Sequence, residues 1–345
     1  MRRHTGECGR VELVRHESTC LAGNPLGDPT AREIAVYLPA GYDGGEGRYP
    51  VLYDLAGFTG SGLKRISWSG FSENVPERLD RLIGTGVMAP AIVVLPDCFT
   101  RLGGNQYIDS SAVGPWATYL TEELVPWIDG RYRTLPGREH RGVYGKSSGG
   151  YGALVHGMLH PETWGGVACH SGDMYFLYGY LPDFPLLVDV LARHEGSVEK
   201  FLAEIERKQK HAGREIHALM TIAMAATYDP DPDAPLGFHL PIDLETGELD
   251  PERWARWLAH DPVEMVERHH EALRSLRFLF VDCGRRDQYR LHHGARILHR
   301  RLAALGVSHR YEEFDDDHSS LDYRLDTSLP ALVRALLPEG EAASG

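Results

Sequence analysis

The strongest constraint on the fold of this chain is an alternation between short apolar runs and longer segments with helical spacing. Helical spacing is clear over Trp116–Ile128 and Leu291–Leu305. Apolar strands separated by helices are typical of a mostly parallel central sheet flanked by helices, so an α/β fold is predicted. The strand candidates are Ile34–Leu38, Val51–Leu55, Ala91–Leu95, Gly142–Tyr144, Val167–Cys169, Phe278–Val281 and Val307–Phe314.

The alternation stops over residues 174–275, which contain helix start signals but no convincing strand. Ser197 is a candidate N-cap for a helix over Val198–Gln209, and Asp250 precedes a proline at a first helical position. Asp261 repeats that pattern, with Glu264 placed to complete a capping box. We therefore expect a helical insertion, or cap, in a core formed by residues 1–173 and 276–345.

The insertion leaves the core after one strand and returns before the next. Because loops at the carboxyl ends of parallel strands lie on the ligand side, we expect the cap on that side. The proline-rich segment Asp229–Pro235 is expected to be extended. Several apolar residues are candidates for the inner face of the cap, for its own core or for a dimer interface: Leu219, Met220, Ile222, Met224, Trp254 and Trp257.

The segment "GKSSG" has the pattern G-x-S-x-G centred on Ser147, whereas Ser148 lacks the flanking glycines. A strand-like run precedes it and an apolar helical stretch follows, which is the context of a nucleophile elbow. Side chains at Gly145 and Gly149 are expected to collide with the neighbouring strand or helix. A phosphate-binding loop would need glycine at position 140, where the chain has His140.

A serine nucleophile needs a histidine to accept its proton and a carboxylate to orient that histidine. His318 follows the last predicted strand, where the histidine of an α/β hydrolase belongs, and Asp287 lies in a loop after the preceding strand. The predicted catalytic residues are therefore Ser147, Asp287 and His318. The competing assignments are His170 for the base, and Asp173 or Asp282 for the acid.

The oxyanion of the tetrahedral intermediate needs two N–H donors. Ser148, directly after the nucleophile, is the first predicted donor. Phe58, in the glycine-rich loop after Val51–Leu55, is the second. Four aromatic residues near the expected loops are candidates for a substrate-binding wall or for the core: Trp68, Tyr107, Trp116 and Tyr151.

Four segments together, "VLYDLAGFTG", "GKSSGGYGAL", "FVDCGRRDQY" and "DDDHSSLDYR", resemble the putative-esterase family of α/β hydrolases. That family includes S-formylglutathione hydrolases, enterochelin-esterase-like proteins, and feruloyl and acetylxylan esterases. The resemblance covers about residues 30–175 and 275–335. It implies an α/β-hydrolase fold with Ser147 as nucleophile, Asp287 as acid, His318 as base, and Phe58 and Ser148 as oxyanion donors.

The chain departs from the family pattern in three places. The insertion is much longer, so the family's substrates do not carry over. Asp54–Gly57 lacks the histidine that many relatives have before the glycine, and Lys146 replaces a small residue.

The composition of the chain narrows the classes of molecule that it is expected to bind. The 345 residues are 42% hydrophobic and carry a net charge of −13, which disfavours binding to nucleic acids or anionic membranes. The first residues contain no apolar segment of a secretory signal, and the five scattered cysteines favour a reducing, cytoplasmic location. No spacing indicates a metal site.

These observations predict a serine carboxylesterase that acts on a small-molecule ester and needs no cofactor. An acyltransferase that uses the same acyl-enzyme is the main alternative. A non-catalytic binding protein on the same fold is a weaker one, because all three triad positions are filled. The oligomeric state stays open, and a homo-oligomer is compatible with the sequence.

Overall fold

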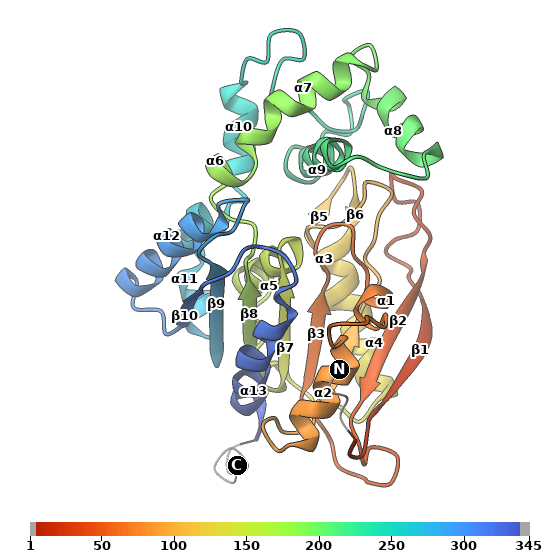
Figure 1. The fold of residues 1–345 in the computed structure, drawn as a ribbon, viewed down its shortest axis with the longest axis vertical. Coiled ribbons are helices and arrows are strands. Elements are labelled where there is room, and N and C mark those ends of the chain that lie inside the picture. Colours follow the sequence, from red (N-terminus) through yellow and green to blue (C-terminus); the bar gives the residue numbers. More distant parts are fainter. Residues whose placement is uncertain (1–4, 339–345) are drawn as a thin grey trace.

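The computed structural model describes residues 5–338, so residues 1–4 and 339–345, at the two ends of the predicted core, lie outside the described residues. Its centre is an eight-stranded sheet in the order β1-β2-β4-β3-β7-β8-β9-β10 (Figure 1). All neighbouring pairs from β4 to β10 are parallel, whereas the β1–β2 and β2–β4 pairs are antiparallel. The predicted mostly parallel sheet is therefore confirmed. The strands are β1 (Arg10–Glu17), β2 (Ala31–Leu38), β3 (Val51–Leu55), β4 (Ile92–Leu95), β7 (Arg141–Lys146), β8 (Gly166–His170), β9 (Phe278–Gly284) and β10 (Arg310–Phe314).

All seven predicted apolar runs form strands of this sheet. β3, β4 and β8 are buried along their whole length, as expected for parallel strands covered on both faces. The edge strand β1 has no counterpart among the predictions. Its sequence alternates charged and apolar residues, and Leu13 in its centre is 60% exposed.

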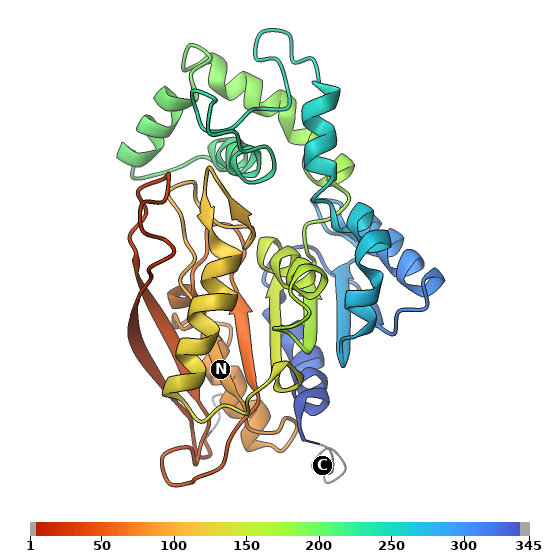
Figure 2. The same cartoon turned by 180° about the vertical axis from the view of Figure 1, so that it is seen from behind.

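Helices cover both faces of the sheet. On one face lie α2 (Val75–Gly84) and α13 (Leu325–Leu336), whose apolar residues form one buried cluster (Figure 1). The opposite face carries α5 (Ser148–Leu159) and a continuous helical run (Figure 2). That run is the predicted helix from Trp116, divided into α3 (Trp116–Thr118), the π-helix η1 (Tyr119–Leu124) and α4 (Val125–Arg131). Within residues 5–338, no helix has both the length and the apolar character needed to cross a bilayer.

The helices of the predicted insertion fall into two groups. α7, α8, α9 and α10 lie beyond the carboxyl ends of the parallel strands (Figure 1), while α11 packs against α5 and α12 beside the sheet. The group at the strand ends has its own aromatic core, in which Phe184 contacts both Trp254 and Trp257. The helices of this region are α6 (Phe176–Gly179), η3 (Leu181–Asp183), α7 (Phe184–Ala192), α8 (Val198–Arg207), α9 (Gly213–Tyr228), α10 (Pro251–Leu258), α11 (Pro262–Arg274) and, after β9, α12 (Leu291–Ala304).

The three predicted N-caps of the insertion are confirmed. The side chains of Ser197, Asp250 and Asp261 accept hydrogen bonds from amides in the first turns of α8, α10 and α11. The predicted capping box at Asp261 is wrong, because the Glu264 side chain pairs with Arg301 at 3.4 Å.

The prediction of an extended segment over Asp229–Pro235 is also wrong. The segment folds into consecutive turns closed by backbone hydrogen bonds, such as Ala234 N to Asp231 O at 3.0 Å. Its first residue is buried, and the Asp229 carboxylate pairs with Arg253 at 3.2 Å and with Arg256 at 2.9 Å. These ion pairs tie the segment to α10.

Candidate active site

Ser147 occupies the sharp turn between β7 and α5, with φ +58° and ψ −126°. Neither of the two flanking glycines has room for a side chain. A Cβ at Gly149 would stand 1.8 Å from the carbonyl oxygen of Leu55 in β3, and one at Gly145 would stand 2.5 Å from the Gly149 backbone. The expected collisions are therefore present, and the turn presents the serine at the carboxyl edge of the sheet.

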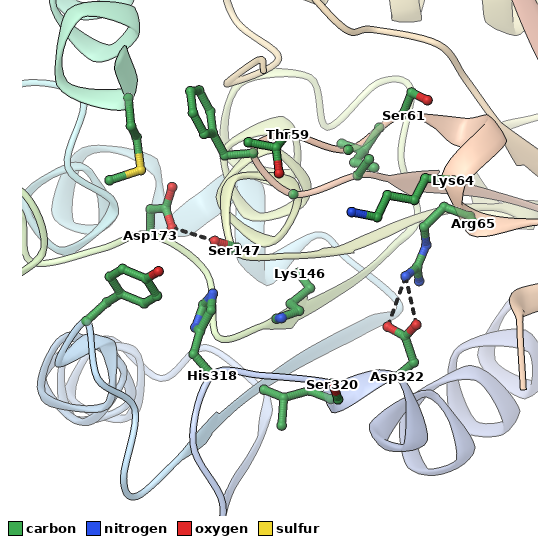
Figure 3. A pocket seen from close by; sticks show the side chains of 18 of the residues that line it. Thr59, Ser61, Lys64, Arg65, Lys146, Ser147, Asp173, His318, Ser320 and Asp322 are labelled. Atoms are coloured by element: carbon green, nitrogen blue, oxygen red, sulfur yellow. Dashed lines mark hydrogen bonds and ion pairs between the residues drawn. The ribbon is translucent and has the colours of Figure 1, made fainter. Parts of the chain in front are cut away.

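His318 and Asp287 meet at the same edge. His318 Nδ1 lies 2.7 Å from Asp287 Oδ2, and both residues are buried. The Asp287 carboxylate also accepts a hydrogen bond from the amide of Tyr289 at 2.9 Å, and the His318 amide donates to Gln288 Oε1 at 2.9 Å. Because Nδ1 is held by the carboxylate, Nε2 is the ring nitrogen left for chemistry. Figure 3 shows His318 next to Ser147.

Asp173 lies on the other side of Ser147 from Lys64 and Arg65 of α1 (Gly62–Arg65) (Figure 3). Ser147 Oγ donates to Asp173 Oδ1 at 3.4 Å and forms no hydrogen bond with His318. The carboxylate also accepts from Ser148 Oγ at 3.0 Å and from Tyr180 Oη at 2.8 Å, while burial raises its pKa. Asp173, the alternative acid, is thus placed against two serines and a tyrosine, and Asp287 is the carboxylate bonded to His318.

The two predicted oxyanion donors flank Ser147. Within residues 5–338 the backbone amides of Phe58 and Ser148 donate to no protein acceptor. The loop after β3 passes close to the serine, since a Cβ at Gly57 would stand 3.4 Å from Ser147 Cβ. The hydrogen bond from the Thr59 amide to Gly103 O, at 2.8 Å, fixes the loop. Two unengaged N–H groups are therefore available beside the serine.

A cavity of about 590 Å³ opens over Ser147, Asp173 and His318. Its floor comes from the loops at the strand ends, and α9 contributes Met220 to the wall. Further lining residues include Ile216 and His217 from α9, Tyr289, Leu291 and Leu321 from the carboxyl half, and Thr59, Ser61, Lys64 and Arg65 from the segment after β3. This space is large enough for a small organic ester.

Of the four aromatic candidates for a substrate wall, only Trp68 lines this cavity. The assignment of the other three is wrong, because they are core residues. Tyr107, Trp116 and Tyr151 are 3%, 0% and 0% exposed, and their polar atoms bond to the backbone. For example, Tyr151 Oη donates to His260 O at 3.1 Å.

The competing histidine, His170, is engaged through both ring nitrogens. Nδ1 lies 2.8 Å from Asp282 Oδ1 and Nε2 lies 2.8 Å from Ser328 Oγ, and neither His170 nor Asp282 lines the cavity. Arg324 completes this buried group with a 2.8 Å ion pair to Asp282. His170 therefore has no free nitrogen to act as a base. Asp282 is the partner of His170 and Arg324 in this buried group and does not orient His318.

Sequence reasoning missed the charged wall of the cavity. Lys64 and Arg65 come from α1 (Gly62–Arg65), and Lys146 directly precedes the serine. Arg65 bridges Asp54 at 2.8 Å and Asp322 at 2.9 Å. The signal for Lys146 was present in "GKSSG", because a residue beside an elbow serine must lie at the same sheet edge. Nothing in the sequence around Lys64 distinguished it.

Curated relatives match part of the chain. An esterase of Mycobacterium tuberculosis, Rv1288, is 29% identical over 166 residues, which cover 47% of this chain and 32% of that protein. The S-formylglutathione hydrolase of Paracoccus denitrificans is 30% identical over 168 residues, which cover 46% of this chain and 56% of the enzyme. The matched stretches thus span less than two thirds of these relatives' own lengths.

Solved structures match the whole fold. A ferulic acid esterase superposes with a TM-score of 0.61 at 21% identity, covering 96% of this chain and all of that one (100%). An S-formylglutathione hydrolase from Staphylococcus aureus has a TM-score of 0.57 at 12% identity, covering 94% and 99% of the two chains. The predicted α/β-hydrolase fold is confirmed by these similarities. The family model described as putative esterase matches residues 29–332. The chain therefore belongs to the putative esterase family.

Proposed function

We propose that this protein is a carboxylic-ester hydrolase that forms an acyl-enzyme on Ser147. The observation that carries the proposal is the position of the 2.7 Å Asp287–His318 pair next to a serine on a strained elbow, inside one cavity. The relatives described above are an esterase and an S-formylglutathione hydrolase, which agrees with cleavage of an ester or thioester bond.

In the acylation step, His318 Nε2 accepts the proton of Ser147 as Oγ bonds to the substrate carbonyl carbon. Asp287 holds the ring in the tautomer that leaves Nε2 free and stabilises the imidazolium that forms. The oxyanion accepts hydrogen bonds from the amides of Phe58 and Ser148. Collapse of the intermediate breaks the ester bond, and His318 protonates the departing alcohol.

Deacylation repeats these steps with water. His318 accepts a proton from the water whose oxygen attacks the acyl carbon, and the second tetrahedral intermediate releases the carboxylic acid and returns the proton to Ser147. Every proton in the cycle passes through one imidazole, so these residues complete the reaction by themselves.

Ser147 must change its hydrogen bond before it reacts. Its hydroxyl donates to Asp173 at 3.4 Å, a long bond that costs little to break. A rotation about the Cα–Cβ bond then directs the proton toward His318. Loose contacts of this kind in unliganded hydrolases tighten when substrate binds.

We further propose that the helices between Phe176 and Leu258 act as a cap that shapes the acyl or alcohol site. The support is the position of α9, whose residues His217 and Met220 line the cavity above Ser147. The cap would exclude bulk water from the acyl-enzyme and select substrates by size.

The test is hydrolysis of a panel of aryl and alkyl esters by the purified full chain. Wild-type protein is expected to hydrolyse at least the aryl acetates, and Ser147→Ala is expected to reduce kcat by about 10⁴-fold or more. Product analysis with an added alcohol separates hydrolysis from acyl transfer. Equal turnover by wild type and Ser147→Ala would contradict the proposal.

A further inference from the structure

Two lysines line the cavity on the side of Ser147 opposite Asp173 (Figure 3). Lys64 belongs to α1, and Lys146 is the last residue of β7, directly before the serine. Both side chains line the cavity at the carboxyl edge of the sheet. Any group bound beside Ser147 on this side would face two ammonium ions.

These two lysines combine a place in the cavity wall with the lack of a protein partner; Lys210 also has no partner in residues 5–338, but it is exposed and lies outside the cavity. The chain has only five lysines and a net charge of −13. Lys200 pairs with Glu195, and Lys208 pairs with Glu204 and Glu215. By contrast, the Lys64 and Lys146 ammonium groups form no hydrogen bond or ion pair with any residue in 5–338. Two cations of an acidic protein therefore line the cavity that contains Ser147 without a protein partner in residues 5–338.

Three acidic side chains in this region already bind arginines. Asp54 and Asp322 both bind the guanidinium of Arg65, at 2.8 Å and 2.9 Å. Glu73, also in the cavity wall, binds Arg81 at 2.7 Å. These pairs leave the two lysines as the cations available to a ligand.

Burial makes a bound anion more favourable at Lys146. Partial removal from water lowers the pKa of its ammonium group, and the nearby charge of Arg65 acts in the same direction. Asp322, Asp287 and Asp317 oppose this effect without cancelling it. A desolvated cation gains more from an anion in direct contact than an exposed cation does.

We propose that this side of the cavity is an anion subsite, formed by Lys64 and Lys146, that binds a carboxylate or phosphate group carried by the ester substrate. The inference rests on the proposed esterase activity and adds the charge class of its substrate. The anion belongs either to the acyl part or to the alcohol part of the ester. Hydroxyl groups of Ser61 and Thr59 in the same wall supply neutral donors beside the lysines.

The experiment compares ester pairs that have one shape and differ in one charge. For the alcohol part, the pair is para-acetoxybenzoate and para-acetoxybenzamide. For the acyl part, it is phenyl para-carboxybenzoate and phenyl para-carbamoylbenzoate. The readout is the ratio of kcat/KM for the anion to kcat/KM for the amide, and the pair with the larger ratio identifies the part that carries the anion.

We expect a ratio of about ten or more in one pair for the wild type, since charge-assisted hydrogen bonds are roughly twice as strong as neutral ones. The double variant Lys64→Met, Lys146→Met should lower that ratio at least tenfold (on the order of 1.4 kcal/mol). Lys146→Arg, which keeps the charge, should restore part of it when Lys64 is present. Lys210→Met, at an exposed lysine outside the cavity, is the matched control.

A ratio near one in both pairs, or a high ratio that the double variant keeps, would overturn the anion subsite. Active sites are counted by fluorophosphonate labelling, so a poorly folded variant does not distort the ratio. Hydrolysis without charge preference would leave the proposed esterase function standing while removing this inference.

A binding measurement tests the anion subsite in a protein that cannot hydrolyse esters, so the subsite can be judged apart from the proposed esterase activity. Ser147→Ala, which has no nucleophile, is titrated calorimetrically with terephthalate and with terephthalamide. Terephthalate should bind at least tenfold more tightly, and the two lysine substitutions should abolish the difference. This result in a protein that hydrolyses no ester would remove the proposed function and leave the anion subsite in place. Equal binding of the two compounds would overturn the subsite.

Discussion

His318 and Asp287 share a 2.7 Å contact between Nδ1 and Oδ2, and the chain contains a second buried pair of the same type, His170 and Asp282, with a 2.8 Å contact. The two pairs differ in what lies at the far side of the imidazole. Nε2 of His170 meets Ser328, whereas His318 opens into the cavity that contains Ser147. The same pair of side chains therefore serves packing in one place and is available for chemistry in the other.

This contrast supplies a matched test of the acid. We predict that Asp287→Asn lowers kcat by about 10⁴-fold, because asparagine favours the wrong tautomer of His318. Asp282→Asn removes an equally buried carboxylate from the other pair, so it should lower thermal stability and leave kcat per labelled active site within about threefold of wild type. Steady-state kinetics on both variants decides the assignment. A large kcat loss in Asp282→Asn, with Asp287→Asn near wild type, would contradict it.

The tight packing around the turn at Ser147 allows a prediction about the free energy of unfolding. Gly149→Ala should lower the free energy of unfolding by about 3 kcal/mol or more, because the added Cβ would stand 1.8 Å from the backbone oxygen of Leu55. Gly130→Ala is the control, since that exposed helical glycine has nothing within 4 Å of its Cβ. It should raise stability by up to about 1 kcal/mol. Chemical denaturation that found equal effects would show that β3 and α5 do not meet as described.

Because the pKa of Asp261 is shifted in the folded state, we predict that the stability of the protein depends on pH. Burial raises its pKa to about 6 from the ordinary 3.8, although the amides of Phe176, Tyr175 and Val263 donate to its carboxylate and act in the opposite direction. The folded state therefore holds this proton more tightly than the unfolded state does. The resulting stabilisation is complete below the ordinary pKa and is lost as pH rises through about 6.

The measurement is the free energy of unfolding of wild type and Asp261→Asn across this range. Because asparagine does not titrate, the wild-type value should fall relative to the variant by up to about 3 kcal/mol between about pH 4 and pH 7. The absolute cost of the substitution does not matter, since the pH dependence of the difference is the readout. Parallel curves would show that Asp261 titrates normally.

The proposed cap predicts selection by substrate size. Met220→Trp should lower kcat/KM for a long-chain aryl ester about tenfold more than for an aryl acetate, because Met220 lines the cavity from α9. Arg214→Trp introduces the same side chain at an exposed position of the same helix and should leave that ratio unchanged. A series of esters of increasing chain length measures the effect. An equal effect of both variants would place the substrate away from α9.

The sequence predicted the features that depend on local patterns. Fully apolar runs identified the parallel strands, and the glycines of "GKSSG" identified a turn that only glycine allows on either side of Ser147. Helix caps at Ser197 and Asp250 were also predictable, since each carboxylate or hydroxyl bonds to amides two or three residues away.

Features that depend on distant residues were not predictable. Tyr107 and Tyr151 look the same in sequence whether they line a cavity or a core, and their burial depends on β3, α5 and α11 packing together. The Asp229–Pro235 turns depend on ion pairs to arginines more than twenty residues away in α10. The edge strand β1 lacked an apolar run, because most of its side chains are at least partly exposed.

The most direct test of the central claim is to find which residue a serine-reactive fluorophosphonate modifies. The account predicts one label per chain on Ser147, located by mass spectrometry of the peptides. Labelling should be absent in Ser147→Ala and retained in Ser148→Ala, because Ser148 contributes only its amide to the reaction, which alanine keeps. A label on Ser148, or undiminished labelling of Ser147→Ala, would contradict the account.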